Sequence, residues 1–532
     1  MTSYISTRGD RTEFSGARAI IQGLAPDKGL FVPTGIPRIS YDFSGAGDAA
    51  SGGSGADGVT GGGSGAGDAA GGAGAPRETG GASRPCTPYR DVAYRVMRAF
   101  FGDFSDDDLH LCVDGAYNSD NFDSPDISPL AKTERAFLLE LYHGRTAAFK
   151  DMALSILPYL LTTAVRMENE DRKIVILTAT SGDTGKAALE GFADVGGTEI
   201  FVFYPKDGVS EIQERQMVTQ GGANTHVYAI EGNFDDAQRA VKAIFGDRDY
   251  EAGLEAGGYR LSSANSINIG RLVPQVAYYY FAYVRLVERG EIRPGDGINV
   301  VVPTGNFGNI LAAWYARAAG LPISRLICAS NENRVLTDLI ETGVYDANRR
   351  FILTSSPSMD ILISSNLERL LWHLSGGDSG EIAGYMRSLE SDGRYEVSGR
   401  VREGMAEFLR GGSADMARSH AAIGDLWRSE RYLMDTHTAV AYSVYRDYAD
   451  ATGDQTPTVV ASTASAYKFA DRVAGAIGLG AESDGFAYID ALHTATGVDV
   501  PRGLRGLRDK AIRHRGVVTA EQMPDAIRTA LG

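Results

Sequence analysis

The chain has 532 residues, of which 43% are hydrophobic and 23% are charged, and its formal net charge is −16. These values are typical of a globular protein with two or three domains. The negative charge argues against nucleic acid and anionic membrane surfaces as general partners, although a local pocket can still bind an anionic small molecule.

The cysteines and the apolar segments exclude several further classes. Cys86, Cys112 and Cys328 lie far apart in the sequence and form no C-x-x-C pair. They predict neither a disulfide framework nor a zinc site, and we expect no metal. Residues 1–10 lack the apolar core of a signal peptide, and no apolar run is long enough to span a membrane. These features predict a cytoplasmic protein.

The N-terminal region contains one segment without globular character. A short helix is expected at 14–23 and an apolar strand at 29–33, and a further helix at 89–101. Between them, residues 44–85 contain 16 glycines and two copies of SGAGDAA, and Val59 is their only apolar side chain larger than alanine. Such a segment cannot bury enough surface to offset its ordering entropy, so we expect a flexible insertion.

A lysine stands at the head of an apolar pattern in HGRTAAFKDMAL, residues 143–154. At helical spacing Lys150 faces the expected interior, near a helix N-terminus where the dipole disfavours a cation. One interpretation is that the stem lies along apolar surface and the ammonium reaches water. The other is a desolvated amine with a lowered pKa that forms a Schiff base. This segment alone favours the first.

From about residue 138 onward, strand and helix patterns alternate. Short β-branched runs predict buried parallel strands, and helical patterns follow most of them. This alternation predicts an α/β fold with mainly parallel sheets, in which ligands gather at the carboxyl ends of the strands. The predicted strands are 173–179, 199–204 and 297–303, with weaker signals at 326–329 and 458–461.

The turn after the first of these strands reads TSGDTGKA, residues 180–187. Glycine and hydroxyl residues between a strand and a helix expose backbone N–H groups that suit an anion. A nucleotide P-loop would need glycine at Thr180 and a hydroxyl at Ala187 to hold magnesium, and both are missing. The remaining alternatives are an anion-binding turn and a capped turn without a ligand.

The turn after strand 297–303 reads TGNFGNI, residues 304–310. Gly305 and Gly308 let the backbone approach a ligand closely, and the asparagines add donors. This pattern suits an organic phosphate held mostly by backbone dipoles, but a tight turn without a ligand explains it equally well.

Three more polar clusters adjoin apolar segments. Residues 265–271 (NSINIGR) precede a helical pattern at 272–286, and residues 355–360 precede another at 361–372. Helix capping explains part of both clusters, but it does not explain Arg271, whose planar donors suit an anion. Residues 461–465 (ASTAS) follow the strand at 458–461, where a neutral hydroxyl is usually a helix cap.

Together these motifs resemble those of threonine synthases, pyridoxal-phosphate enzymes of the tryptophan-synthase-β-like group (fold type II). The resemblance spans nearly the whole chain, in the family's order. It is carried by YISTRG (4–9), GLAPDKGL (23–30), HGRTAAFKD (143–151), TATSGDTG (178–185), NSINIGR (265–271), PTGNFGNI (303–310), SSNLERLL (364–371), DTHTAVA (435–441) and STASAYKF (462–469).

The resemblance implies roles for individual residues. Lys150 would be the Schiff-base lysine that holds pyridoxal 5'-phosphate and shuttles protons. Thr463 would face the pyridine nitrogen with a neutral hydroxyl. The residues implied for the cofactor phosphate are Gly305, Asn306, Phe307, Gly308 and Asn309. Those implied for the substrate or the cofactor's ring hydroxyl are Ser181, Asp183 and Thr184, with Asn265 and Arg271 for the substrate phosphate.

The implied reaction converts O-phospho-L-homoserine and water into L-threonine and phosphate. Departures from the family's usual motifs are Arg145 for proline, Thr436 for proline, and Ser465-Ala466 for His-Pro. None removes a catalytic group, but the last lies beside Thr463. Three alternatives stay open: a threonine-synthase-like phospholyase that releases a keto acid, a non-catalytic phosphate- or nucleotide-binding protein, and a cofactor-binding protein without activity.

The expected architecture is that of fold type II, with two α/β domains behind an N-terminal segment. We place the N-terminal domain at 1–140, an α/β domain with the lysine and the SGDTG loop at 141–295, and a second α/β domain with the GNFGN loop at 296–532. Within the last of these, residues 378–419 are too irregular in pattern to assign. The oligomeric state is not predicted.

Overall fold

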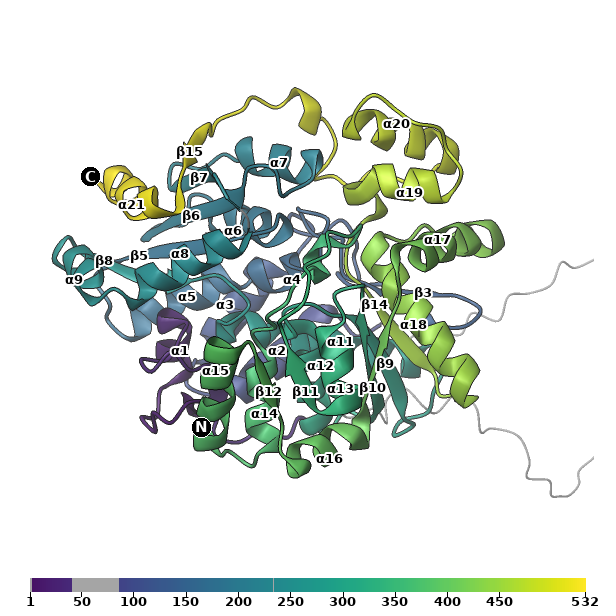
Figure 1. Ribbon diagram of the computed structural model, residues 1–532, viewed down its shortest axis with the longest axis horizontal. Helices are drawn as coiled ribbons and strands as arrows, with labels where there is room; N and C mark the ends of the chain where they lie inside the picture. Colours follow the sequence, from purple (N-terminus) through teal and green to yellow (C-terminus); the bar gives the residue numbers. More distant parts are fainter. Residues whose placement is uncertain (1, 41–85, 233) are drawn as a thin grey trace, which may run out of the picture.

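Two mainly parallel sheets form the centre of the molecule (Figure 1). The computed structural model describes residues 2–40, 86–232 and 234–532, so the predicted insertion at 44–85 lies outside the described residues. Every neighbouring pair in the two sheets is parallel except β3 with β4. The predicted α/β fold with mainly parallel sheets is therefore confirmed.

The first sheet has six strands, and its central members come from the middle and the C-terminal part of the chain. Its strands are, in spatial order, β13 (Leu409–Ser413), β10 (Ile323–Ser330), β9 (Ile298–Pro303), β14 (Thr458–Ser462), β4 (Phe137–Glu140) and β3 (Leu130–Lys132).

The second sheet has five strands, and its edge strand β15 comes from the end of the chain. In spatial order its strands are β15 (Gly516–Val518), β7 (Thr225–Ile230), β6 (Thr198–Pro205), β5 (Lys173–Ala179) and β8 (Tyr259–Ser263). Two short antiparallel pairs complete the strands: β1 (Tyr4–Ser6) with β2 (Phe31–Pro33), and β11 (Val344–Asp346) with β12 (Arg394–Glu396).

The helices lie between the sheets and over their outer faces. The first half of the chain contributes α1 (Gly16–Gln22), α2 (Tyr89–Phe100), α3 (Asp106–Ala116), α4 (Asp151–Leu154), α5 (Leu157–Met167), α6 (Asp183–Phe192), α7 (Glu211–Val218), α8 (Phe234–Gly246), α9 (Arg248–Ala256), α10 (Ile269–Leu272) and α11 (Pro274–Glu288).

The second half of the chain contributes α12 (Gly308–Ala318), α13 (Val335–Thr342), α14 (Leu367–Leu374), α15 (Ser379–Asp392), α16 (Gly399–Phe408), α17 (Met416–Glu430), α18 (Thr436–Thr452), α19 (Ala470–Ala476), α20 (Gly485–Thr496) and α21 (Met523–Leu531). The 3₁₀ turns in the described ranges are η2 (Pro357–Met359), η3 (Ala466–Phe469), η4 (Leu507–Asp509) and η5 (Ala520–Gln522).

Strand residues alternate between two cores, as the period of two requires. In β9, Val300 and Val302 join the large core that contains α11 and α12, whereas Val301 joins the core beneath α18. In the five-stranded sheet, Val202 faces the large core and Phe201 faces a third core under α8 and α21. Because both faces are covered, the strands read as continuous apolar runs.

Two expected helices differ from those observed. The apolar pattern from Phe149 to Leu161 predicted one helix, but the chain breaks at Ser155 and Ile156 into α4 and α5, and Pro158 lies in the first turn of the second. The helix expected at 361–372 begins only at Leu367, because the residues before it form the loop that contacts Gly305 and Asn306.

Both ends of the described chain pack against distant segments. Thr7 and Arg8 contact Glu368 of α14 through hydrogen bonds of 2.6 to 2.9 Å. At the other end, β15 pairs with β7, and α21 buries Met523 and Ile527 against the five-stranded sheet. The three predicted domain ranges stay a prediction. The sheets cross those ranges, since β3 and β4 join β14, and β15 joins β7.

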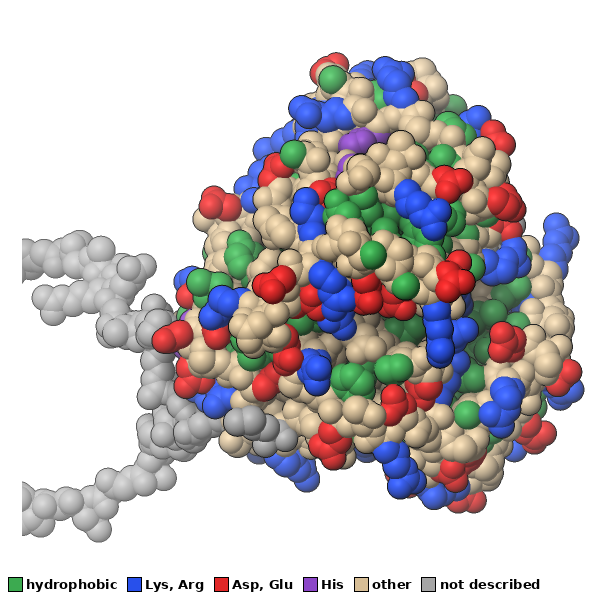
Figure 2. All heavy atoms as spheres, turned by 90° about the vertical axis from the view of Figure 1, so that its left-hand side faces the viewer, with side chains coloured by type: hydrophobic (Ala, Val, Ile, Leu, Met, Phe, Trp, Pro, Cys, Tyr) green, Lys and Arg blue, Asp and Glu red, His purple; other side chains and the backbone are tan. Residues whose placement is uncertain are grey.

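The surface seen in Figure 2 carries Lys and Arg side chains intermixed with Asp and Glu. The net charge of −16 is therefore not gathered into one acidic field on this face. Among the described residues, no helix combines the length and the apolar character needed to cross a bilayer.

Candidate active site

The segment that carries Lys150 is a compact loop closed by its own side chains. Asp151 accepts hydrogen bonds from the Thr146 backbone N–H at 2.8 Å and from the Thr146 hydroxyl at 2.7 Å. A Cβ at Gly144 would lie 2.4 Å from the Asp151 side chain, so only glycine leaves room for this closure. Ala147 has a φ of 59°, which turns the chain within the loop. The loop delivers Lys150 to the first position before α4.

The Lys150 loop lies against the segment that follows β14. The Phe149 N–H donates to the Thr463 carbonyl at 2.8 Å, and the Ser465 N–H donates to the Ala147 carbonyl at 3.0 Å. Ala148 and Ala464 form an isolated antiparallel bridge between them. The structure therefore brings the predicted residues Lys150 and Thr463, far apart in sequence, to the same edge of the six-stranded sheet.

Lys150 has the features of a reactive amine. Its side chain keeps partial exposure, and among the described residues its amine makes no hydrogen bond or ion pair. It lies 4.4 Å from the ring centroid of Phe149. Burial, and then the positive charge of Arg271, lower the pKa of Lys150 to about 7. The lowered pKa supports the Schiff-base interpretation over the one that the sequence segment alone favoured.

The TSGDTG loop is ordered by Thr180, whose hydroxyl accepts hydrogen bonds from the N–H groups of Gly182 and Gly185 at 2.9 and 2.8 Å. Helix α6 begins at Asp183, earlier than the sequence pattern predicts. Ser181 and Thr184 keep partial exposure, and their hydroxyls make no hydrogen bond within the described part of the chain. Both hydroxyls are thus available to a ligand.

Lys186 excludes the nucleotide P-loop on structural grounds. Its ammonium pairs with Glu190 at 2.8 Å on the same helix and also contacts Gln220. A P-loop lysine must reach phosphate oxygens from the turn. Lys186 is committed elsewhere, and the missing hydroxyl at Ala187 agrees with that conclusion.

Asp183 is paired with a lysine that the sequence analysis did not single out. The Lys468 ammonium lies 2.7 Å from Asp183 Oδ1, and Gln213 Nε2 donates to the same oxygen at 2.9 Å. Asp183 Oδ2 makes no hydrogen bond among the described residues. Burial would raise the pKa of the Asp183 carboxyl, but the charge of Lys468 and the two hydrogen bonds outweigh it and lower the pKa. Lys468 was detectable only as the lysine of the STASAYKF motif.

The GNFGN loop forms a cradle at the start of α12. Phe307 precedes the helix in the left-handed conformation, with a φ of 62°, and makes no side-chain cap hydrogen bond. The first-turn N–H groups of α12 therefore lack the usual capping partner. A Cβ at Gly308 would make ordinary van der Waals contacts, at 3.6 Å from Asn366 Nδ2 and 3.8 Å from Gln275 Nε2, so Gly308 lies beside both amides.

Two asparagines and an arginine complete the cradle. Tyr279 donates to Asn309 Oδ1, and the buried Asn309 Nδ2 has no hydrogen-bond partner among the described residues. Asn366 Nδ2 donates to the Asn306 carbonyl at 3.0 Å, and Arg369 contacts Asn366 Oδ1. Arg369 is fully buried, and burial lowers the pKa of its guanidinium to about 10. Asn366 and Arg369 of the SSNLERLL motif thus hold the GNFGN loop in place.

Arg271 is a buried cation without a carboxylate partner. It is 1% exposed, and within the described residues its guanidinium makes one hydrogen bond, from Nη1 to the Ala264 carbonyl at 2.8 Å. Its Nε and Asn265 Oδ1 are buried without partners among the described residues. Burial lowers the pKa of Arg271 to about 10. A buried guanidinium of this kind needs an anion, because burying an unpaired charge is costly.

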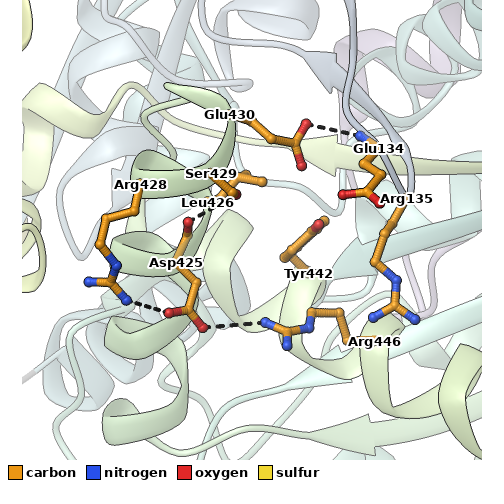
Figure 3. Close-up of a pocket in the computed structure, with 9 residues that line it drawn as sticks. All are labelled: Glu134, Arg135, Asp425, Leu426, Arg428, Ser429, Glu430, Tyr442 and Arg446. Atoms are coloured by element: carbon orange, nitrogen blue, oxygen red, sulfur yellow. Dashed lines mark hydrogen bonds and ion pairs between the residues drawn. The ribbon is translucent and has the colours of Figure 1, made fainter.

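A hollow of about 490 Å³ lies away from these residues (Figure 3). Its charged side chains largely satisfy one another: Asp425 pairs with Arg428 and Arg446, and Glu430 accepts from the Glu134 N–H. Arg135 pairs with Asp450. No cluster of His, Cys, Asp and Glu within the described part of the chain has the make-up of a metal site.

Comparisons with known proteins agree with this geometry. Residues 116–397 match the family described as pyridoxal-phosphate dependent enzyme. Residues 3–48 match the threonine synthase N terminus, and residues 438–527 match the threonine synthase C-terminal family. A threonine synthase from Pseudomonas aeruginosa is 34% identical over 472 residues, which are 88% of this chain and 89% of that protein.

The chain belongs to the threonine synthase family of pyridoxal-phosphate dependent enzymes.

Other relatives differ in length. Human "Threonine synthase-like 1" is 40% identical over 374 residues, but the match covers 69% of this chain and only 49% of that protein. The chain thus spans about half the length of these relatives. The structure of the pyridoxal-phosphate-bound threonine synthase from Brucella melitensis superimposes with a TM-score of 0.80 at 31% identity, covering 100% of this chain and 99% of that one. The yeast threonine synthase structure gives a TM-score of 0.80 at 29% identity, covering 99% and 98%.

The residues present fit the family's cofactor. An aldehyde needs an amine with a lowered pKa, which Lys150 provides. A phosphate needs unpaired donors, which the start of α12 and Asn309 Nδ2 provide. Membership of this threonine synthase family thus explains why these polar groups are buried and unpaired.

Proposed function

We propose that the protein is a threonine synthase that converts O-phospho-L-homoserine and water into L-threonine and phosphate. The observation that carries this proposal is the Lys150 amine, partly exposed, without a hydrogen-bond partner among the described residues, and bordered by the buried, unpaired Arg271. A reactive amine beside an unpaired cation suits an amino-acid substrate that carries a phosphate.

The proposed cofactor site uses residues from both sheets. Lys150 attaches pyridoxal 5'-phosphate, and Gly305, Asn306, Phe307, Gly308 and Asn309 hold its phosphate. Thr463 faces the ring nitrogen, which a neutral hydroxyl polarises less than a carboxylate would. When bound, the cofactor withdraws electrons from the substrate and acidifies the carbon beside the amino group.

The proposed substrate site surrounds Lys150. Ser181, Asp183 and Thr184 orient the substrate carboxylate or the cofactor's ring hydroxyl, and the partly exposed hydroxyls support this role. Asn265 and Arg271 hold the substrate phosphate. Lys150, with a pKa of about 7, takes and returns protons at the substrate carbons near neutral pH. Overall, the bond between the γ-carbon and the phosphate oxygen breaks and phosphate leaves with the electron pair. The β-carbon loses a proton and gains the hydroxyl of water, and the γ-carbon gains a proton and becomes a methyl group.

The substrate class and the location complete the proposal. We propose a small-molecule substrate and no nucleic-acid or membrane partner. We propose the cytoplasm as the location, supported by three unpaired cysteines, of which Cys112 and Cys328 are buried.

The test is a product assay on purified protein supplied with pyridoxal phosphate and O-phospho-L-homoserine. We expect a visible absorbance band that borohydride fixes on Lys150, and threonine and phosphate in equal amounts. Lys150→Ala should lose both the band and the activity. Lys132→Ala is the matched control, because Lys132 is exposed and pairs with Glu291 on the surface.

Two results would replace the proposal. A keto acid as the main product would make the protein a phospholyase of the same family, since both reactions share their early steps. An absorbance band with no product at all would indicate a cofactor-binding protein without this activity.

A further inference from the structure

Lys468 is a buried lysine whose amine contacts three segments of the candidate site. The residue is 1% exposed and lies in η3, three residues after Ser465. Its Nζ donates to Asp183 Oδ1 at 2.7 Å, to the Thr146 carbonyl at 3.1 Å and to Gln216 Oε1 at 3.1 Å. Three acceptors use all three hydrogens of an ammonium. Lys468 therefore has no donor left for a substrate.

The three acceptors belong to elements that must keep a fixed relation to one another. Thr146 lies in the Lys150 loop, Asp183 is the first residue of α6, and Gln216 lies in α7. Gln213, also in α7, donates to the same Asp183 oxygen as Lys468. One side chain thus joins the Lys150 loop to the TSGDTG loop and to the helix behind both.

We infer that Lys468 is a positioning residue that holds Asp183 and the Lys150 loop in the arrangement the reaction needs. The inference rests on the proposed function for the role of Lys150, and it adds a residue that touches neither substrate nor cofactor. Removing Lys468 leaves the Asp183 carboxylate with Gln213 as its one hydrogen-bond partner among the described residues. Removing Asp183 takes away the carboxylate that pairs with the Lys468 ammonium.

The charges of Lys468 and Asp183 provide a way to distinguish a positioning role of Lys468 from a contribution to packing alone. The charged groups that act on the Lys150 amine are Arg271, Asp183 and Lys468: Arg271 and Lys468 lower the pKa of Lys150, and Asp183 raises it. Neutralising Lys468 and neutralising Asp183 should therefore move the Lys150 titration in opposite directions. Loss of packing alone would not produce opposite signs.

The experiment follows the Lys150 amine in the cofactor-free protein. Competitive acetylation at pH 5.5 to 9.5, quantified by mass spectrometry of the Lys150 peptide, gives the midpoint of its titration. We expect Lys468→Met to raise that midpoint and Asp183→Asn to lower it, each by about one pH unit. The double variant D183N/K468M should return most of the way to the starting value.

Lys186→Met is the matched control. Lys186 is also a buried lysine paired with a carboxylate, Glu190, but it is not among the charged groups that shift the pKa of Lys150. This variant should lower the melting temperature as Lys468→Met does, without moving the Lys150 midpoint. Lys468→Arg keeps the charge and should keep the midpoint within a few tenths of a unit.

The outcomes separate cleanly. If the Lys150 titration midpoint is unchanged, or moves in the same direction in Lys468→Met and Asp183→Asn, the inference is wrong and Lys468 contributes only to stability. Because the readout is chemical labelling of cofactor-free protein, failure of the threonine assay would overturn the proposed function without deciding this inference. Opposite shifts would support it whatever the product is.

Discussion

The reactivity of Lys150 depends on the absence of a hydrogen-bond or ion-pair partner for its amine as much as on the charges around it. Other lysines with little or partial exposure have acceptors: Lys186 pairs with Glu190, and Lys468 pairs with Asp183. Lys150 has neither hydrogen bond nor ion pair among the described residues, and Arg271 adds an unfavourable charge. An amine in this state is a stronger nucleophile near neutral pH than an ordinary lysine.

The imidazole of His143, seven residues before Lys150, makes stability depend on pH. Its Nδ1 lies 3.0 Å from Asp123 and its Nε2 lies 2.8 Å from Glu140. Burial opposes protonation, but the hydrogen bonds and charges of these carboxylates outweigh it and raise the pKa of His143 from 6.5 to about 9. The imidazolium therefore ties the Lys150 loop to the end of β4.

We predict that the free energy of unfolding falls as the pH rises from about 6.5 to 9. The folded-state pKa lies above the unfolded one, so the stabilisation is complete below about 6.5 and lost as the pH passes 9. The total change is up to about 3 kcal/mol. Urea unfolding at several pH values would measure it. His143→Gln should flatten this part of the profile, and an unchanged slope in that variant would contradict the assignment.

Among the elements, the connection between α20 and β15 passes close to the Lys150 loop. A Cβ built at Gly503 would lie only 1.8 Å from the Arg145 carbonyl oxygen. Nearby, Arg502 donates to the carbonyl oxygens of Ser119 and Asp120, and Arg145 Nε also donates to Asp120. The atoms nearest to this Cβ belong to the Arg145 backbone, so rotation of a side chain could not relieve the clash.

Gly503→Ala should therefore push this connection away from the Lys150 loop. We expect a loss of about 1–3 kcal/mol of stability, typical of overpacking, and a lower affinity for pyridoxal phosphate. Gly480→Ala is the control, because a Cβ at Gly480 meets nothing within 4 Å. Calorimetry and cofactor titration would test both variants. Equal behaviour of the two would show that the connection does not press on the loop.

At this scale the sequence predicted some features well and others not at all. The strand 173–179 is observed as β5 with the same bounds, because β-branched runs bounded by turns are a local signal. The break between α4 and α5 was missed, since Phe149, Met152, Ala153, Ile156 and Leu160 keep helical spacing across it. The role of Lys468 was also out of reach, because its partners Thr146, Asp183 and Gln216 come together only in the fold.

For the whole molecule, the C-terminal segment links the two sheets. The chain leaves the six-stranded sheet after β14, passes through α19 and α20, and ends on the five-stranded sheet as β15 and α21 (Figure 1). No local pattern predicted that β15 would pair with β7. The pairing depends on an edge that exists only after the sheet has formed.

Docking of α21 should matter to the stability of the entire five-stranded sheet. Ile527 is fully buried in the outer core of that sheet. Ile527→Ala should cost about 2–5 kcal/mol and should make residues 498–515 easier for a protease to cleave. Val517→Ala, at a half-exposed position of β15, should change either measurement little. A protease-resistant Ile527→Ala protein would mean that α21 is dispensable.

The late position of β15 also bears on how the protein is made. On the ribosome, β7 emerges early, whereas the strand that covers its edge is among the last segments synthesised. At about 5–20 residues per second, that edge stays open for on the order of tens of seconds. An open edge invites pairing with other nascent chains. Synthesis, rather than the finished fold, is therefore the stage at which this protein is most exposed to aggregation and to chaperones.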